Sequence, residues 1–297
     1  MASIDLMMQF SSSDPLARLD DLRRMIQKQP QRSDLRVFLF QVYCIQGEWA
    51  RAATQLDVLM ELDPSSKPMV QTYREALRCE VLRRDVFAGT RSPLVLGSPS
   101  DWLAWLLEAL KLEGQASNEA DAGVRDRTFA AAAQLRAQAL ETAQAISGSI
   151  DGARFAWLAD ADARLGPVFE AIISGKYYWV PIGRLQRVEV EKPADLRDFV
   201  WAPATLTLAN SAAHVALIPA RYPGTEHEAS DALRLARATE WRERPGGAFH
   251  GVGQRMLATD QAESALLDVR VLAFDVPAEP AADAAGPDDP PAAAHDV

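Results

Sequence analysis

Apolar residues recur every three or four positions through the first half of the chain, which is typical of amphipathic helices. On this pattern we expect helices over residues 13–27, 35–46, 48–62, 68–88, 101–114 and 125–146. The last of these is rich in alanine, whose small side chain permits close packing against a neighbour. The first half is therefore predicted to be an array of helices.

Short polar and turn-forming residues divide these helices from one another. Ser13 or Asp14 is expected to cap the first helix and Ser33 or Asp34 the second, because their side chains accept hydrogen bonds from the first turn. Gly47 is expected to end the second helix. Since so little chain separates the second helix from the third, the two must fold back on each other.

The pattern changes near "SGSIDGARF", at residues 147–155. Beyond it, short runs of β-branched and aromatic residues alternate with glycine and proline, as in a series of strands. One helix over residues 161–174 and one helical turn over residues 193–199 are expected among them. No long helix recurs between successive strands, so a doubly wound parallel sheet is disfavoured. We predict a mainly antiparallel α+β domain, with a barrel-like sheet as one form it can take.

The whole chain is thus expected to have a two-part α+β fold. Its predicted segments are a flexible N-terminus (1–12), a helical tetratricopeptide-like domain (13–148), an α+β domain (149–275) and an acidic tail (276–297). The tail is rich in proline and alanine and has no aromatic residue, so we expect it to be disordered.

The second and third helices match the 34-residue tetratricopeptide pattern in spacing. Arg36 and Phe40 depart from it, because the pattern has tryptophan and a small residue at these places. The leucines of such a hairpin need a third helix to cover them. The predicted core and turn positions of this helical scaffold are Leu39, Tyr43, Gly47, Ala52, Leu56, Leu59 and Pro64.

Composition places the 297-residue chain among soluble globular proteins, with 48% hydrophobic and 24% charged residues. It has no apolar run long enough to span a membrane and lacks the pattern of a secretory signal, so neither a membrane span nor export is expected. A net charge of -10 weighs against nucleic acid or an anionic membrane as partner, because both attract basic surfaces. Cys44 and Cys79 stand apart from any paired motif and are expected to be buried thiols.

Few residues suggest catalytic or metal chemistry. His227, Glu228 and Asp231 lie close together in a predicted loop, where polar residues are common, so we predict no metal site. Asp160 and Asp162 are expected to cap the following helix rather than to act as an acid and base. "PGGAFHGVG" matches no phosphate-binding motif and is expected to be a tight turn entering a strand. We therefore predict no catalytic residue and no cofactor, while an enzyme without a recognisable motif stays open from the residues alone.

Aromatic residues are the most conspicuous feature of the second half. In a strand, Tyr177 and Trp179 would share one face and Tyr178 the other. Such a strand is either covered on both sides within the core or forms an aromatic platform for a partner's helix or strand. Trp201 and Trp241 allow the same two interpretations. The concave face of the helices offers one possible partner-binding site and the aromatic strands another. We favour the strands and name these five residues as the candidate site, because alternate aromatic faces and an open strand edge accept a helix or strand readily.

Longer strings of the sequence carry a family resemblance. In chain order these are "LRVFLFQVYCIQGEWARAATQLDVLMELDP", "MVQTYREALRCEVLRRDVFAG", "DADARLGPVFEAIISGKYYWVPI", "DLRDFVWAPATLTLAN", "ALIPARYPGTE" and "GVGQRMLATD...LLDVR". Together they resemble the ImpE family, also called TagJ or SciE-type proteins, of bacterial type VI secretion systems. The resemblance extends over roughly residues 14 to 275.

The resemblance implies a cytoplasmic accessory protein without catalytic activity. Family members are linked to the contractile sheath through the N-terminal helix of its small subunit, TssB, and to the ClpV ATPase, which recycles contracted sheath. Two alternatives stay open from the residues alone: a tetratricopeptide-like adaptor of another cytosolic complex, and a small-molecule enzyme using the α+β domain. The polar residues available to such an enzyme are Asp160, Asp162, Arg221 and His250.

Overall fold

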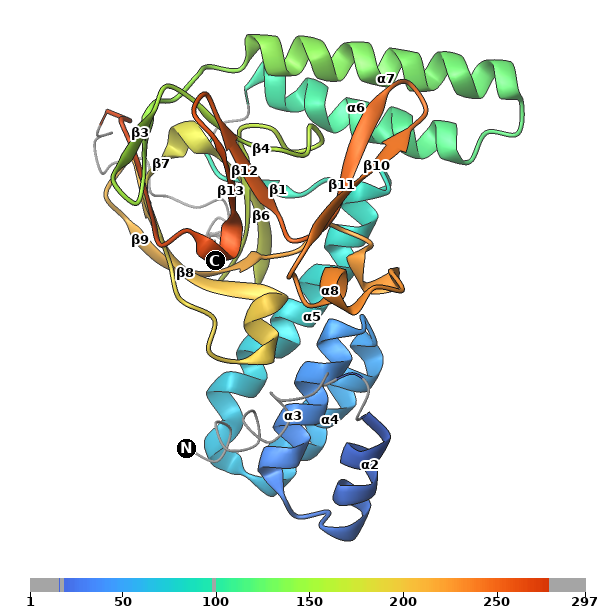
Figure 1. Ribbon diagram of the computed structural model, residues 1–297, viewed down its shortest axis with the longest axis vertical. Helices are drawn as coiled ribbons and strands as arrows, with labels where there is room; N and C mark the ends of the chain where they lie inside the picture. Colours follow the sequence, from blue (N-terminus) through green and yellow to red (C-terminus); the bar gives the residue numbers. More distant parts are fainter. Residues whose placement is uncertain (1–15, 17–18, 98–99, 278–297) are drawn as a thin grey trace, which may run out of the picture.

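The computed structural model describes residue 16, residues 19–97 and residues 100–277 (Figure 1). The predicted flexible N-terminus, the capping residues Ser13 and Asp14, and nearly all of the predicted acidic tail lie outside the described residues. Among the described residues, no helix has both the length and the apolarity needed to cross a lipid bilayer.

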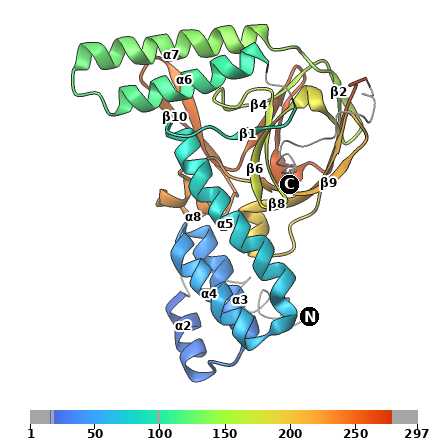
Figure 2. The same cartoon turned by 180° about the vertical axis from the view of Figure 1, so that it is seen from behind.

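Two groups of helices form, and both were predicted from the helical spacing. The first comprises α2 (Leu19–Lys28), α3 (Ser33–Ile45), α4 (Trp49–Leu62) and α5 (Lys67–Phe87). The second is the hairpin of α6 (Asp101–Ser117) and α7 (Ala122–Thr142), which projects at the opposite end of the molecule (Figure 1). Figure 2 shows α5 running between the two groups along the sheet. A short helix, α8 (Asp231–Arg234), lies in the second half.

The start of α3 differs from the expectation. Arg32 is the residue that precedes the helix, and Ser33 is already its first residue. The Asp34 carboxylate instead accepts a hydrogen bond of 2.8 Å from Arg32 Nε. The predicted caps at Ser33 and Asp34 are therefore wrong, because the arginine occupies the carboxylate.

The second half contains a nine-stranded sheet in the order β1-β6-β5-β9-β8-β7-β14-β2-β3. Neighbouring strands are antiparallel except β1 and β6, so the prediction of a mainly antiparallel sheet is confirmed. The two outermost described strands, β1 and β3, do not pair with each other; the sheet is open, and the barrel-like form is wrong. Its strands are β1 (Leu94–Val95), β2 (Gly148–Ile150), β3 (Ala153–Phe155), β5 (Val168–Ile173), β6 (Lys176–Pro181), β7 (Leu185–Val190), β8 (Trp201–Leu208), β9 (Ala213–Pro219) and β14 (Val271–Phe274).

Two smaller sheets accompany the large one. The hairpin of β10 (Thr239–Arg244) and β11 (Ala248–Gly253) turns at the predicted glycine pair. The strands β4 (Leu158–Asp160), β12 (Met256–Thr259) and β13 (Glu263–Ala265) form the other sheet. The 3-10 turn Leu196–Phe199 confirms the single helical turn expected over residues 193–199.

The helix expected over residues 161–174 is wrong. Its apolar part is β5, in which all six side chains are buried. A short continuous apolar run does not distinguish a helix from a strand buried on both faces. The decisive features are Pro167, which interrupts a helix, and the two-residue turn of Ser174 and Gly175, which returns the chain into β6.

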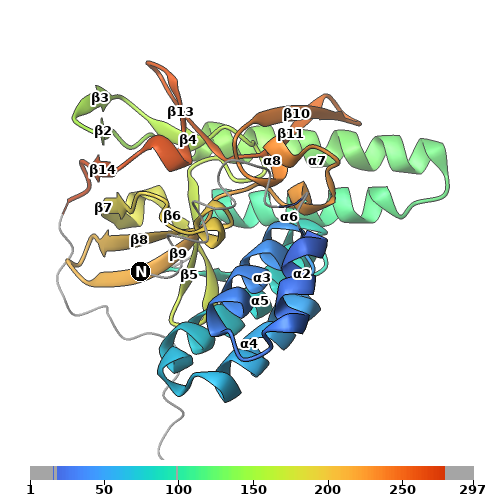
Figure 3. The same ribbon diagram turned by 60° about the horizontal axis from the view of Figure 1, so that its bottom comes forward.

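One hydrophobic core joins the helices to the sheet. The cluster of buried residues that includes Leu39, Leu56 and Leu77 from the helices also includes Trp179 and Trp201 from the sheet. A second cluster fills the far side of the sheet, around Phe169, Val188 and other residues. Figure 3 shows α2 on the outer side of α3, away from the sheet. The helical array is therefore anchored through α3, α4 and α5, and α2 is its outermost member.

Candidate functional site

Three of the five predicted partner-binding aromatics are inside the protein. Tyr177, Trp179 and Trp201 are each exposed by at most 1%. Tyr177 and Trp179 do share one face of β6, as expected, but the helices cover that face: the Trp179 ring lies 5.9 Å from that of Phe87. The prediction that these three residues contact a partner is wrong, because they hold this chain's own helices to its sheet.

Trp201 shows the same role at the other helices. Its ring centroid lies 5.8 Å from Tyr73 on α5 and 6.0 Å from Trp49 on α4. Its indole N–H donates a hydrogen bond of 2.8 Å to the Glu80 carboxylate. A buried indole N–H needs an acceptor, and Glu80 supplies it, so tryptophan fits this position.

Tyr178 and Trp241 lie elsewhere. Tyr178 is half-buried against the second core cluster. Trp241 is 37% exposed on the β10–β11 hairpin, with its ring 5.7 Å from that of Tyr222. Partner binding by these two residues stays a prediction.

A buried network of charges connects α5 with the sheet. The Arg83 guanidinium donates to both carboxylate oxygens of Glu170 on β5, at 2.6 and 2.9 Å. Arg255 lies 3.4 Å from the same carboxylate and donates at 2.8 Å to Asp160. Burial opposes ionisation of Glu170, but the charges of Arg83 and Arg255, together with the hydrogen bonds from Arg83 and Tyr177, outweigh burial and lower the pKa of this carboxyl.

The polar residues that were named as available to an enzyme each interact with another residue inside this protein. Asp160 accepts from Arg255 and Tyr222, and Asp162 from Arg164 and the backbone N–H of Gly251. No helix follows the two aspartates, so their predicted role as helix caps is wrong. Both carboxylates instead neutralise buried arginines, and this structural role needs only their negative charge and no acid or base catalysis.

Arg221 and His250 are engaged in the same way. Arg221 donates to the Ile45 and Cys44 carbonyls at 2.9 and 3.3 Å, so it satisfies the C-terminal end of α3. His250 Nε2 lies 3.7 Å from the Glu113 carboxylate on α6, and burial lowers the pKa of its imidazole. These residues hold elements of the fold together and do not converge on an open cleft.

The loop with His227 does not gather ligands around one point. The His227 side chain is 78% exposed and lies 3.9 Å from Glu226, while Glu228 pairs with Arg242 and Asp231 with Arg234. Within residues 16, 19–97 and 100–277, no group of three His, Cys, Asp or Glu side chains is arranged to hold a metal ion.

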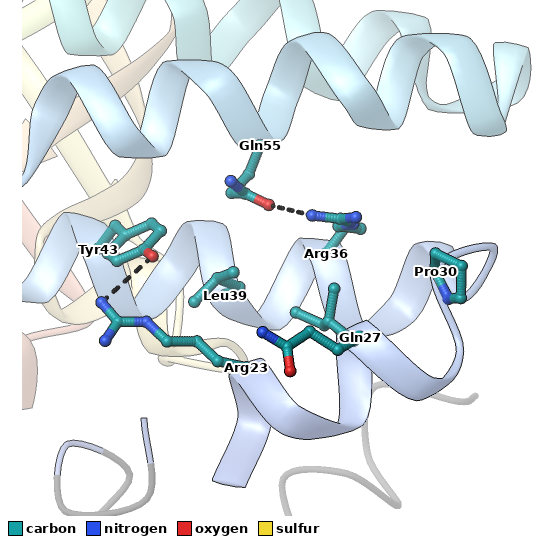
Figure 4. A pocket seen from close by; sticks show the side chains of 8 residues that line it. Arg23, Gln27, Pro30, Arg36, Leu39, Tyr43 and Gln55 are labelled. Atoms are coloured by element: carbon teal, nitrogen blue, oxygen red, sulfur yellow. Dashed lines mark hydrogen bonds between the residues drawn. The ribbon is translucent and has the colours of Figure 1, made fainter. Parts of the chain in front are cut away.

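An open groove lies between α2, α3 and α4 (Figure 4). Its volume is about 390 Å³. Arg23, Ile26, Gln27 and Pro30 line it from α2 and the following turn, Arg36, Leu39 and Tyr43 from α3, and Gln55 from α4. It is the candidate docking groove.

The docking groove has an apolar floor and polar rims. Ile26, Leu39 and Tyr43 are buried along the floor. Arg36 Nη1 donates at 3.0 Å to Gln55 Oε1, and Arg23 Nη2 lies 3.5 Å from the Tyr43 hydroxyl (Figure 4). An amphipathic segment has the complementary distribution of apolar and polar groups.

A second hollow of about 460 Å³ lies between the end of α5 and α6. Its lining includes Lys111 and Glu108, which pair with each other at 3.2 Å. The two charges thus satisfy one another, and the docking groove is the better candidate.

The predicted scaffold residues lie at or near the docking groove, but their spacing in the sequence did not predict that a groove forms there. Leu39 and Tyr43 form part of its floor, and Gly47 makes the turn from α3 to α4 with a φ of 69°. Ala52, Leu56 and Leu59 are buried on α4, and Pro64 begins a 3-10 turn after it. Arg23, Arg36 and Gln55 were not foreseen as a set, because they come from three helices and share no spacing in the sequence.

Comparison with known proteins gives three findings. Residues 152–273 match the family model described as ImpE protein. The chain is 50% identical over 262 residues to a Pseudomonas aeruginosa protein named type VI secretion system accessory component TagJ, covering 87% of this chain and 88% of that one. The crystal structure of VPA1032 from Vibrio parahaemolyticus matches with a TM-score of 0.77 and 22% identity, over 90% of this chain and 96% of that one. The last finding concerns the fold alone.

Proposed function

The chain belongs to the ImpE family, and on that premise we propose that it is a non-catalytic accessory protein of a bacterial type VI secretion system. The observation that carries this proposal is the 50% identity, over 262 residues, to the accessory component TagJ. Two proteins this similar over nearly their whole length share a fold, which supports a shared role. The proposed location is the cytoplasm.

The proposed partner is the sheath small subunit TssB, bound through its N-terminal helix, with a link to ClpV-dependent sheath recycling. The docking groove between α2, α3 and α4 supports a helical ligand, because its floor is apolar and its rims carry arginine and glutamine. The helices around it would then serve as a tetratricopeptide-like scaffold. Coupling to ATP would belong to the ATPase.

The absence of catalysis is supported by the engagement of the polar side chains. Asp160, Asp162 and Arg221 each contact buried groups of this chain. Such residues stabilise a binding module, and their bonds would have to break before they could act on a substrate.

A pull-down with the full chain as bait tests the proposal. The prey are TssB, TssB lacking its N-terminal helix, and ClpV, each offered separately. We expect retention of TssB and loss of retention when its N-terminal helix is absent. If full-length TssB is not retained by a folded bait, the proposed partner is wrong.

A further inference from the structure

Arginine and carboxylate side chains are matched along α2 and α3, with one exception. Residues 19–45 contain four arginines. Arg23 pairs with Asp20, Arg24 with Asp21 and Arg32 with Asp34. Arg36 has no carboxylate within ion-pair distance in the part of the chain that the structure describes, and its guanidinium donates there to the neutral amide of Gln55.

The residues around Arg36 do not supply acceptors for all the N–H donors of its guanidinium. Arg36 Nε is shielded from solvent and has no acceptor among the described residues. A guanidinium carries five N–H donors in a fork that matches a carboxylate with two parallel bonds. The Gln55 oxygen at 3.0 Å satisfies one donor. A shielded donor without an acceptor is unfavourable, so the site is incomplete as it stands.

The position of Arg36 also fits a helical ligand. Arg36 and Tyr43 lie seven residues apart on α3 and face the same groove, so the groove extends over about 10 Å, or two turns of helix. Figure 4 places Tyr43 and Arg36 on either side of Leu39 along α3, with Gln55 reaching toward Arg36 from the opposite helix. A docked amphipathic helix would present apolar residues to this floor and one further side chain to Arg36.

We propose that Arg36 receives a carboxylate from the helix that docks in the groove, in a paired, fork-like contact beside Gln55. The inference rests on the proposed function, because the docked helix is the partner's. Charge complementarity selects the acidic side chain: a lysine or arginine of the partner would be repelled at this position.

The test is a double-mutant cycle by calorimetry, with the full chain and a synthetic peptide of the TssB N-terminal helix. Arg36→Gln is expected to weaken binding about tenfold. One peptide in a series with each Asp or Glu replaced singly by its amide should lose as much, and should lose nothing further against Arg36→Gln. Arg36→Lys should recover only part of the affinity, because it keeps the charge without the fork.

Arg32→Gln is the matched control, since Arg32 is an exposed arginine that precedes the same helix and is paired with Asp34. Its affinity for the peptide should equal that of the unaltered chain, and circular dichroism should show native folding of every variant. Equal binding of the peptide by folded Arg36→Gln overturns the inference and leaves the proposed function standing. If neither the unaltered chain nor a chain lacking residues 1–15 binds the peptide, the proposed partner itself is wrong.

Two other occupants are separated by the same assay. Peptide binding that arises only after removal of residues 1–15 would assign the groove to this chain's own N-terminus. Competition by rising concentrations of the protein would assign it to a second copy. Either result overturns the proposal.

Discussion

Whether a side chain of this protein lies in the core or at the surface depends on which other elements pack over it. Alternation along β6 correctly placed Tyr177 and Trp179 on one face, but no local pattern says that α5, some ninety positions earlier in the chain, packs on that face. The same holds for Asp160 and Asp162: their arginine partners include Arg255, which is far away in sequence. Sequence identifies residues with strong preferences, and long-range contacts then decide between core and surface.

Trp201→Ala is expected to destabilise the fold rather than to weaken partner binding selectively. The substitution removes a fully buried ring and leaves the Glu80 carboxylate without its indole donor, at a cost of about 3–5 kcal/mol in the free energy of unfolding. Urea denaturation measures this. Trp241→Ala is the comparison, because its ring is 37% exposed and the change should stay within about 1 kcal/mol. Equal effects of the two substitutions would contradict this assignment.

Asp162→Asn is expected to remove a pH-dependent part of the stability. Burial alone would raise the pKa of this carboxyl, but the charge and hydrogen bonds of Arg164 outweigh burial and lower it below 3.8. A lowered pKa in the folded state stabilises the protein above pH 3.8, and this contribution is lost as the pH falls below that value. The variant should thus be less stable at pH 7, by about 3–5 kcal/mol, with a difference that shrinks toward pH 3.

Urea unfolding at pH 7, 5 and 3 measures that difference. Glu189→Gln is the control, since its pair with Arg187 is exposed and such pairs contribute at most about 1 kcal/mol. A gap between Asp162→Asn and the unaltered chain that stays constant over the whole pH range would contradict the assigned role of the carboxylate.

At the scale of elements, the helices were predictable and two of the described strands were not. The helices α3, α4 and α5 lie within one or two residues of their predicted bounds, because each has a helical apolar period and a clear end signal. β5 was mistaken for a helix because its apolar run has no period of its own. β1 was missed, since two residues between turn formers give too short a pattern.

Gly47→Ala is expected to cost at least about 1 kcal/mol of unfolding free energy. The residue has a φ of 69°, and an added Cβ would lie 2.5 Å from Glu226 Cγ in the sheet half. Gly152→Ala is a matched control, because its φ is 88° while the space around it is open. Thermal unfolding of both variants separates backbone strain from the contact, and the Gly47 variant should be the less stable. The reverse order would show that the turn does not press against the sheet half.

At the scale of the whole molecule, the predicted two-part organisation describes the chain order but not the packing. Leucines of α3, α4 and α5 share one buried cluster with Trp179 and Trp201. Composition does change near residue 148, where the helices end, yet a composition boundary carries no information about whether two halves bury surface against each other. The open form of the sheet likewise depends on the pairing of strands distant in sequence.

A chain cut at residue 148 is therefore expected to yield halves that do not fold alone. Separation would expose Tyr73 and Leu77 on one fragment and Trp179 and Trp201 on the other. Each purified fragment should lack the near-ultraviolet circular dichroism of packed aromatic rings, whereas the full chain should unfold in one cooperative transition. Two separate transitions in the full chain, or a fragment with native aromatic signals, would show independent domains.

The Arg83–Glu170 contact fixes the orientation of α5 against the sheet. A paired guanidinium and carboxylate are bonded at defined angles, so α5 has one rotational setting about its own axis against β5, which a purely apolar contact would not impose. Of the helices that frame the groove, α3 and α4 contact α5 and α2 packs on α3, so the orientation of all three depends on that of α5. A ligand bound in the groove would thus have one fixed orientation relative to the projecting α6–α7 hairpin. The protein would hold anything bound to that hairpin at a constant angle to the ligand.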